Sequence, residues 1–173
     1  MKQTATWLIA VATAGLQNAV QAQSTEIVQG LRFDVSYSLL NVTTPPSSYD
    51  PVGIRLGISK PMWGMVEAEG LVGMGVQAGK NSVNPALTTQ VGSFVGGYIK
   101  PNFQLSPAVS GFARVGLAST QIKNGDTHNG LSAGLGLNYA LDANMRIYVD
   151  YTIYKSSDSL GISGLNLGVN YGF

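Results

Sequence analysis

The strongest constraint on this chain is an alternation of apolar and polar residues with a period of two. From Leu31 to Leu39 every odd position is apolar and every even position is polar. This period is typical of a β-strand with two unlike faces, whereas an amphipathic helix needs a period of 3.6. The alternation returns in Ile54–Ser59, Val66–Gly70 and Arg146–Ile153. The sequence therefore predicts an all-β protein.

Other stretches carry glycine where these four carry polar residues. Phe112–Leu117, Ser132–Tyr139 and Asn166–Phe173 keep the alternation, and Gln90–Lys100 shows it least clearly. Together the stretches predict about eight strands, an even number as in bacterial barrels.

The composition limits where such strands can lie. Only 11% of the residues are charged and the net charge is +1, so the chain lacks the basic surface of a nucleic-acid binder. No mature segment has the ~20 consecutive apolar residues of a transmembrane helix. Strands cross lipid only in a closed sheet, because every backbone N–H and C=O group must be paired there. We therefore expect an eight-stranded antiparallel up-and-down transmembrane β-barrel.

The outward face of this barrel would be free of charge. It would carry Leu31, Phe33, Val35, Ile54, Leu56, Ile58, Val66, Val72, Leu135, Leu137, Ile147, Val149, Ile153, Leu165, Leu167 and Val169.

The opposite face collects the charged residues, so we expect a polar network in the lumen. Its members would be Arg32, Asp34, Arg55, Glu67, Glu69, Arg114, Asn138, Arg146, Asp150, Asn166 and Asn170, with Lys100 near one rim. A barrel of about eight strands is just wide enough for side chains to fill. Opposite charges would pair there, because an isolated buried charge costs several kcal/mol. This network would close the lumen and distinguish the protein from a general porin.

The connections between the strand candidates alternate in length. The longer ones are Asn41–Asp50, Gly79–Thr88, Gln121–Asn129 and Lys155–Ser159, and the shorter ones are Lys60–Trp63, Pro101–Pro107 and Leu141–Asn144. Bacterial barrels place short turns in the periplasm and long loops outside. The alternation predicts that both termini are periplasmic.

Aromatic residues near the predicted strand ends suit a girdle at the membrane interface. They are Trp63, Tyr98, Tyr139 and Tyr171, with Phe173 at the chain end. Glycines within the strands would leave room for bulky neighbours in the lumen. They are Gly57, Gly92, Gly96, Gly116, Gly134, Gly136, Gly164 and Gly168.

The first residues are typical of a signal peptide. Lys2 supplies a basic start, Trp7–Gly15 is apolar, and Val20 and Ala22 form a small-x-small cleavage pattern. We expect cleavage after Ala22, with residues 1–22 as the signal peptide and 23–173 as the barrel domain.

The last eight residues, Asn166–Phe173, resemble the assembly signal of outer-membrane proteins. Asn166, Gly168, Tyr171 and the terminal Phe173 carry this resemblance. It implies that the barrel-assembly machinery is a partner during biogenesis.

Three further stretches resemble the small OmpA/OmpX-like outer-membrane β-barrel family, also called the opacity or porin-like β-barrel domain. They are Gly53–Val76, Ser110–Thr120 and Gly130–Tyr154. The resemblance implies a bacterial outer-membrane location among lipid and lipopolysaccharide. Family members serve as anchors, adhesins, invasion or serum-resistance factors and phage receptors. We expect no peptidoglycan-binding domain of the full OmpA type and therefore no anchoring to the cell wall.

Two broad functions compete. The leading interpretation is a non-enzymatic barrel without cofactor or metal, whose loops contact an extracellular ligand or receptor or which serves an envelope structural role. The alternative is an outer-membrane enzyme acting on lipid A or phospholipid, with His128, the one histidine, as base beside Asp126 and Thr127.

A third interpretation, a soluble periplasmic barrel with an apolar interior, suits the sequence poorly. Its outer face would have to be polar, and the charged face here is too sparse to cover a water-soluble surface.

Overall fold

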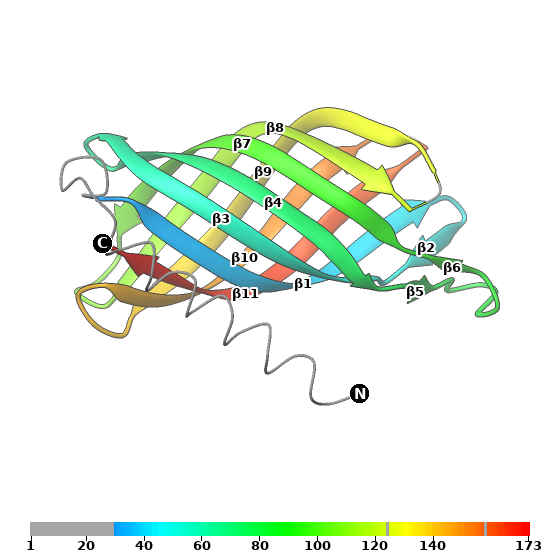
Figure 1. The fold of residues 1–173 in the computed structure, drawn as a ribbon, viewed down its shortest axis with the longest axis horizontal. Helices are drawn as coiled ribbons and strands as arrows, with labels where there is room; N and C mark the ends of the chain where they lie inside the picture. Colours follow the sequence, from blue (N-terminus) through cyan, green and yellow to red (C-terminus); the bar gives the residue numbers. More distant parts are fainter. Residues whose placement is uncertain (1–29, 124, 158) are drawn as a thin grey trace, which may run out of the picture.

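The computed structural model describes residues 30–123, 125–157 and 159–173. Eight long strands form a closed barrel (Figure 1). They are β1 (Arg32–Thr44), β3 (Val52–Trp63), β4 (Val66–Gln77), β7 (Val91–Gln104), β8 (Val109–Ile122), β9 (Thr127–Ala140), β10 (Met145–Ser156) and β11 (Gly161–Gly172). Three short strands lie in the connections: β2 (Ser47–Tyr49), β5 (Gly79–Lys80) and β6 (Thr88–Thr89). The predicted signal peptide, with Val20 and Ala22, lies outside the described residues.

The barrel closes where the last strand meets the first. β1 and β11 pair antiparallel from Arg32↔Gly172 to Thr43↔Gly161. Each other long strand pairs antiparallel with the long strand before it. The predicted eight-stranded antiparallel up-and-down barrel is confirmed. In the described part of the chain, no helix is long and apolar enough to cross a membrane.

The two ends of the barrel differ. The end that holds Phe173 and the start of β1, here called the termini end, lies at the left of Figure 1. The opposite end, here called the loop end, carries β2, β5 and β6 at the right.

Short turns close the termini end. Gly64, between β3 and β4, has a φ of 54°, which a glycine adopts without a Cβ clash. Between β9 and β10, the Asp142 carboxylate accepts hydrogen bonds from the backbone N–H groups of Asn144 (2.8 Å) and Met145 (2.7 Å). These two bonds hold the pKa of Asp142 below its usual value, because they stabilise the charged form.

Several predicted connections are in fact strands. β3 continues through Lys60–Trp63, β7 reaches Gln104, and β1 runs past Asn41 to Thr44. Their backbone groups keep pairing with the neighbouring strand beyond the point where the side chains stop alternating. Pairing satisfies N–H and C=O groups whatever the side chain, so polarity alone placed these strand ends too early.

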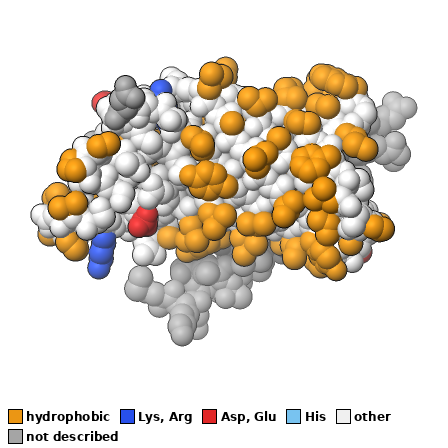
Figure 2. All heavy atoms as spheres, turned by 180° about the vertical axis from the view of Figure 1, so that it is seen from behind, with side chains coloured by type: hydrophobic (Ala, Val, Ile, Leu, Met, Phe, Trp, Pro, Cys, Tyr) orange, Lys and Arg blue, Asp and Glu red, His pale blue; other side chains and the backbone are white. Residues whose placement is uncertain are grey.

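The outer wall is apolar. Leu131 is 78% exposed, Leu167 63% and Val72 52%. Every residue of the predicted outward set is exposed or half-buried. Figure 2 shows hydrophobic side chains spread over one side of the barrel, with few charged groups among them. This wall suits contact with hydrocarbon.

The lumen contains two layers of side chains. Toward the termini end lies the polar layer, defined as Arg32, Asp34, Arg55, Glu67, Glu69, Lys100, Arg114 and Asp150 with their hydrogen-bond partners. Toward the loop end lies the apolar layer, defined as Leu40, Val42, Val91, Phe94, Ala118, Tyr154, Leu160 and Ile162.

Candidate functional site

The centre of the polar layer is the ion pair of Arg55 and Asp150. Both side chains have no solvent exposure, and Arg55 Nη2 lies 2.6 Å from Asp150 Oδ2. The other guanidinium nitrogen, Nη1, donates to Asp150 Oδ1 at 3.4 Å. This bidentate geometry is the strong form of an arginine–carboxylate pair.

Three further donors complete the hydrogen bonding of Asp150. Its carboxylate accepts hydrogen bonds from Thr152 Oγ1 (2.7 Å), Asn166 Nδ2 (2.8 Å) and Arg114 Nη2 (3.4 Å). Ser38 on β1 in turn donates to Asn166 Oδ1 at 2.7 Å. The site thus joins five strands of the barrel wall through one buried carboxylate.

A second group of ion pairs lies nearer the termini end. Lys100 Nζ lies 3.1 Å from Glu67 Oε2 and 3.2 Å from Glu69 Oε1. Arg32 Nε lies 3.6 Å from Glu67 Oε1, and Arg114 Nε lies 3.3 Å from Glu69 Oε2. The contacts to Glu67 Oε2 and Glu69 Oε2 are electrostatic rather than hydrogen bonds, since neither oxygen has a hydrogen-bond partner among the described residues. Arg114 therefore links both groups of charges.

Aromatic side chains contact the charged groups of the polar layer. Tyr148 donates to Asp34 Oδ1 at 2.7 Å and accepts from Arg55 Nη2 at 3.0 Å. The Phe112 ring lies 5.0 Å from Lys100 Nζ and 5.2 Å from the Arg114 guanidinium carbon. Cations so placed over a ring face gain from its negative charge density.

Glycines leave the space that these side chains fill. A Cβ on Gly57 would lie 1.9 Å from Asp34 Oδ2, and one on Gly136 would lie 2.4 Å from Phe112 Cζ. In the apolar layer, a Cβ on Gly73 would lie 2.1 Å from Phe94 Cζ. Large lumen residues thus face strand positions without side chains.

The structure places the predicted lumen residues on the inner face. Asn138 and Asn170 are buried and line a small cavity with Asp34, Glu69, Arg114 and others. Arg146 is half-buried at the termini end, and no described carboxylate lies within ion-pair distance of it. The arrangement brings the other charged members together and leaves Arg146 at the edge.

The predicted aromatic girdle needs one correction. Trp63, Tyr139 and Tyr171 are exposed near the termini end. Tyr98, in contrast, points into the lumen, is 4% exposed, and hydrogen-bonds with Ser132 Oγ at 2.9 Å. The sequence did not show that Tyr98 faces the lumen, because β7 alternates weakly. Glycines stand at positions where other strands carry polar residues, namely Gly92, Gly96 and Gly97.

The C-terminal residues lie on both faces of β11. Asn166 is fully buried beside Asp150, Gly168 is half-buried against Tyr148, and Tyr171 is exposed. The Phe173 ring packs edge-on against Tyr171 (4.9 Å) and Phe33 (5.5 Å).

His128 lies in a strand rather than in the loop that the sequence suggested. It is the second residue of β9 and pairs with Thr120 of β8. Among the described residues, no hydrogen bond joins His128 to Asp126 or Thr127, and no group of three His, Asp or Glu side chains is placed to bind a metal.

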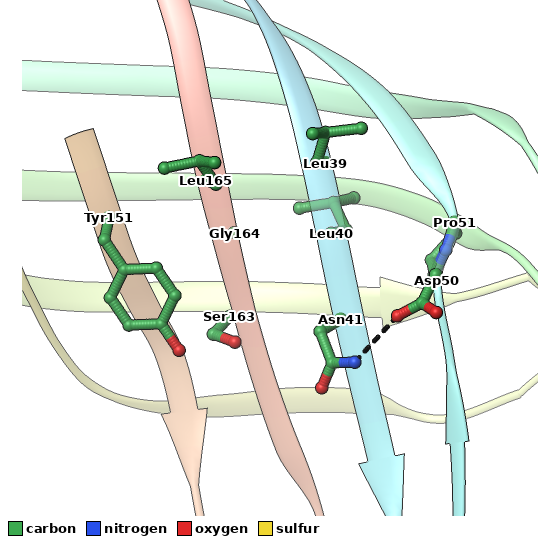
Figure 3. A pocket seen from close by; sticks show the side chains of 9 residues that line it. All are labelled: Leu39, Leu40, Asn41, Asp50, Pro51, Tyr151, Ser163, Gly164 and Leu165. Atoms are coloured by element: carbon green, nitrogen blue, oxygen red, sulfur yellow. Dashed lines mark hydrogen bonds between the residues drawn. The ribbon is translucent and has the colours of Figure 1, made fainter. Parts of the chain in front are cut away.

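A groove of about 390 Å³ lies over β1 and β11 toward the loop end (Figure 3). Leu39, Tyr151 and Leu165 give it an apolar wall, and Asn41 Nδ2 donates to Asp50 Oδ1 at 2.8 Å. His128 is not among its lining residues, so the groove does not bring together an acid and a base.

The apolar layer is the feature that the alternation missed. Phe94 and Tyr154 pack at a ring distance of 5.0 Å, and Leu40, Val42 and Ile162 are nearly fully buried beside them. One sequence signal marks it: at Leu39–Leu40 two apolar residues follow one another, so both faces of β1 become apolar.

Comparisons with known proteins agree with this fold. A model of the outer membrane protein β-barrel domain matches residues 8–173. Neisserial surface protein A covers 84% of this chain with 98% of its own, at 16% identity and a TM-score of 0.64. The attachment invasion locus protein Ail of Yersinia pestis covers 84% of this chain with 99% of its own, at 18% identity and a TM-score of 0.61.

A third similar structure is the N-terminal β-barrel domain of Pseudomonas aeruginosa OprF. It covers 84% of this chain with 98% of its own, at 15% identity and a TM-score of 0.53. No curated protein sequence matches this chain significantly. At these identities the structures show a shared fold.

Proposed function

Because this chain belongs to the outer membrane protein β-barrel domain family, we propose that it is a closed, non-enzymatic outer-membrane scaffold that presents its loop end for contact. The observation that carries the proposal is that two successive layers of buried side chains lie in the lumen. A barrel of this width conducts solutes only where its interior leaves a continuous path.

The packing supports a closed lumen. The cavity beside Asp34 and Arg114 has a volume of about 10 Å³, close to the space that one water occupies. Next along the lumen, Phe94, Tyr154 and Leu40 are each at most 3% exposed. An ion crossing the barrel would have to break the charge network and then displace the apolar layer.

Planar bilayer recordings test this proposal. The purified full chain should show no steady conductance, while a general porin reconstituted in the same way serves as the positive control. A steady large conductance would overturn the closed-scaffold proposal.

The loop end offers a preorganised surface. Tyr49 forms a β-bridge with Asn81, and Ser82 N donates to Ser48 O at 2.9 Å. Asn81 Oδ1 accepts from the backbone N–H groups of Val83 (2.7 Å) and Asn84. The first two loops are therefore fixed to each other, and Val83 at 70% exposure stands at their tip. A rigid, partly apolar surface binds with less loss of entropy than mobile loops do.

The proposal also includes the orientation of the chain in the membrane and its biogenesis. Both termini would be periplasmic, residues 1–22 would be removed after Ala22, and Phe173 would belong to the signal read by the barrel-assembly machinery. Intact-mass measurement of the mature protein tests the cleavage. Deleting Phe173 should reduce the yield of assembled barrel more than it lowers the stability of barrel already folded, and equal effects on both would contradict the assembly role.

The proposal that the chain is not an enzyme has its own test. Lipid A and phospholipids from cells with and without the protein should have identical mass spectra. A mass shift that His128→Ala abolishes would replace the scaffold proposal with an enzymatic one.

A further inference from the structure

The seam between β9 and β10 is incomplete at the loop end. These two strands pair from Arg146↔Ala140 to Ile153↔Ala133, and no pair follows. On its other side β9 continues to pair with β8 up to Gln121↔Thr127. The six residues of β9 nearest the loop end, Thr127–Ser132, therefore pair with β8 on one edge and with no strand on the other.

A bulge in β10 explains why the strands separate. The register of β10 against β11 shifts between Ile153 and Lys155, which adds one residue to β10. Tyr154, within the bulge, turns into the lumen and packs on Phe94 in the apolar layer. Bulges bend the strand that carries them, so β10 follows β11 and leaves β9.

The direction of the free backbone groups follows from neighbouring hydrogen bonds. Ala140 N donates to Ala108 O, on the β8 side, so even-numbered residues of β9 point toward β8. Leu141 N donates to Met145 O, and Lys155 Nζ donates to Asn129 O at 3.1 Å, so odd-numbered residues point toward β10. The N–H groups of Thr127, Asn129 and Leu131 thus face the open seam.

The side chains beside the open seam indicate the chemistry of a segment that could bind there. On the outer face of β9, the apolar residues end at Leu131, and the polar Asn129 and Thr127 follow. Leu131 is 78% exposed, and the Lys155 amino group reaches across the seam. Unpaired strand edges of this kind accept an added strand through main-chain hydrogen bonds.

We propose that the free edge of β9 at Thr127–Ser132 binds an extended peptide segment of another protein, aligned antiparallel to β9. Its backbone would pair with Thr127, Asn129 and Leu131 after displacing the Lys155 amino group from Asn129 O. An apolar side chain would cover Leu131, and an acidic side chain would bind the displaced Lys155. This inference rests on the proposed function, because the loop end must face the aqueous exterior for such a segment to reach it.

A second copy of this chain fits the edge poorly. Two copies in one membrane are related by an axis along the membrane normal, so their β9 strands would run in the same direction. The N–H groups of the same residue in the two copies would then face each other at the same height. Neither a parallel nor an antiparallel hydrogen-bond ladder can form in that arrangement. The occupant is therefore a segment of another protein, which can run antiparallel to β9.

The test uses the full chain in lipid nanodiscs and a blocked synthetic peptide of alternating valine and threonine with one glutamate. Adding the peptide should shift the amide NMR signals of Thr127, Asn129 and Leu131 and slow their hydrogen exchange by about tenfold or more. The amides of His128 and Gly130, already paired with β8, should change less.

A matched pair of variants isolates the backbone edge. Asn129→Pro removes one outward N–H without removing a β8 hydrogen bond and should weaken peptide binding by about tenfold or more, whereas Asn129→Ala keeps the N–H and should bind as the native chain does. Heat-modifiable migration in SDS gels shows whether each variant is folded. If Asn129→Pro does not fold, Thr127→Pro removes the next free N–H with the same expected loss.

No peptide-dependent change at these three amides, or equal binding by a folded proline variant, would overturn the inference. A spectrum consistent with self-association in place of peptide binding would overturn it in favour of a second copy. The proposed function would survive either result as long as the barrel stays non-conducting, so the two failures are distinguishable.

Discussion

The two layers of side chains in the lumen are stabilised by different physical means. In the polar layer, charges from facing strands neutralise one another around Asp150, which accepts five hydrogen bonds. In the apolar layer, Phe94 and Tyr154 pack without any ion pair among the residues that define the layer. The first arrangement depends on every partner being present, while the second depends on volume.

The largest expected effect comes from breaking the polar layer at its centre. Asp150→Ala leaves Arg55 and Arg114 buried without their shared carboxylate, so the free energy of unfolding should fall by about 3–5 kcal/mol. Denaturant unfolding from lipid vesicles measures the loss. Asp126→Ala, at an exposed carboxylate, is the control, and an equal effect of both variants would show that the network does not stabilise the barrel.

A smaller effect is expected from overfilling the apolar layer. Gly73→Ala places a methyl group against the Phe94 ring and should cost about 1–3 kcal/mol of unfolding free energy. Gly70→Ala in the same strand is the control, because its Cβ would meet only Ile58 Cγ2 at 3.6 Å. If the two variants unfold at the same denaturant concentration, the apolar layer is not tightly packed.

Removing one methyl group from the apolar layer should have a milder effect. Ile162 is 1% exposed, so Ile162→Val should lower the free energy of unfolding by about 0.5–1.5 kcal/mol. Ile147→Val, on the outer wall at 40% exposure, should cost less in the same unfolding assay. A greater loss of unfolding free energy in Ile147→Val than in Ile162→Val would contradict the assignment of Ile162 to a packed lumen and Ile147 to the outer wall.

The smallest effect is expected outside both layers, at the Asp142 turn. Its lowered pKa means that the ionised carboxylate stabilises the fold above the pKa of the unfolded chain, and this contribution disappears as the pH falls through the folded pKa. Asp142→Ala should therefore be slightly less stable than the native protein at about pH 7, and the difference should shrink as the pH is lowered below about 4. A stability difference that persists at the lower pH would contradict this assignment.

The contrast between the layers also explains what the sequence predicts and what it does not. Arg32, Asp34 and Glu69 are easy to place, because a charge inside an apolar alternation has only one face open to it. Leu40, Val42 and Ile162 carry no such signal, because an apolar residue suits either the lipid or a packed lumen. The prediction for Tyr98 was wrong for a related reason. β7 carries glycines where other strands carry polar residues, so its sequence does not show which residues face the lumen.

The free edge of β9 lay beyond prediction for another reason. It depends on the register shift at Ile153/Lys155, which is a relation between two strands and not a property of either one. Similarly, the pairing of Arg55 with Asp150 joins residues 95 positions apart. Periodicity assigns both to the inner face but does not set their heights along the barrel.

The most direct test of a lumen filled by two layers is the solvent accessibility of the boundary between them. The chain has no cysteine, so a single Ser38→Cys variant places one thiol where Ser38, fully buried, lies between Ser36 and Leu40. In proteoliposomes treated on both sides with a small charged thiol reagent, this thiol should stay unlabelled while Val83→Cys at the exposed loop tip reacts fully. Labelling of both variants at similar rates would show an open path through the barrel and contradict the closed lumen.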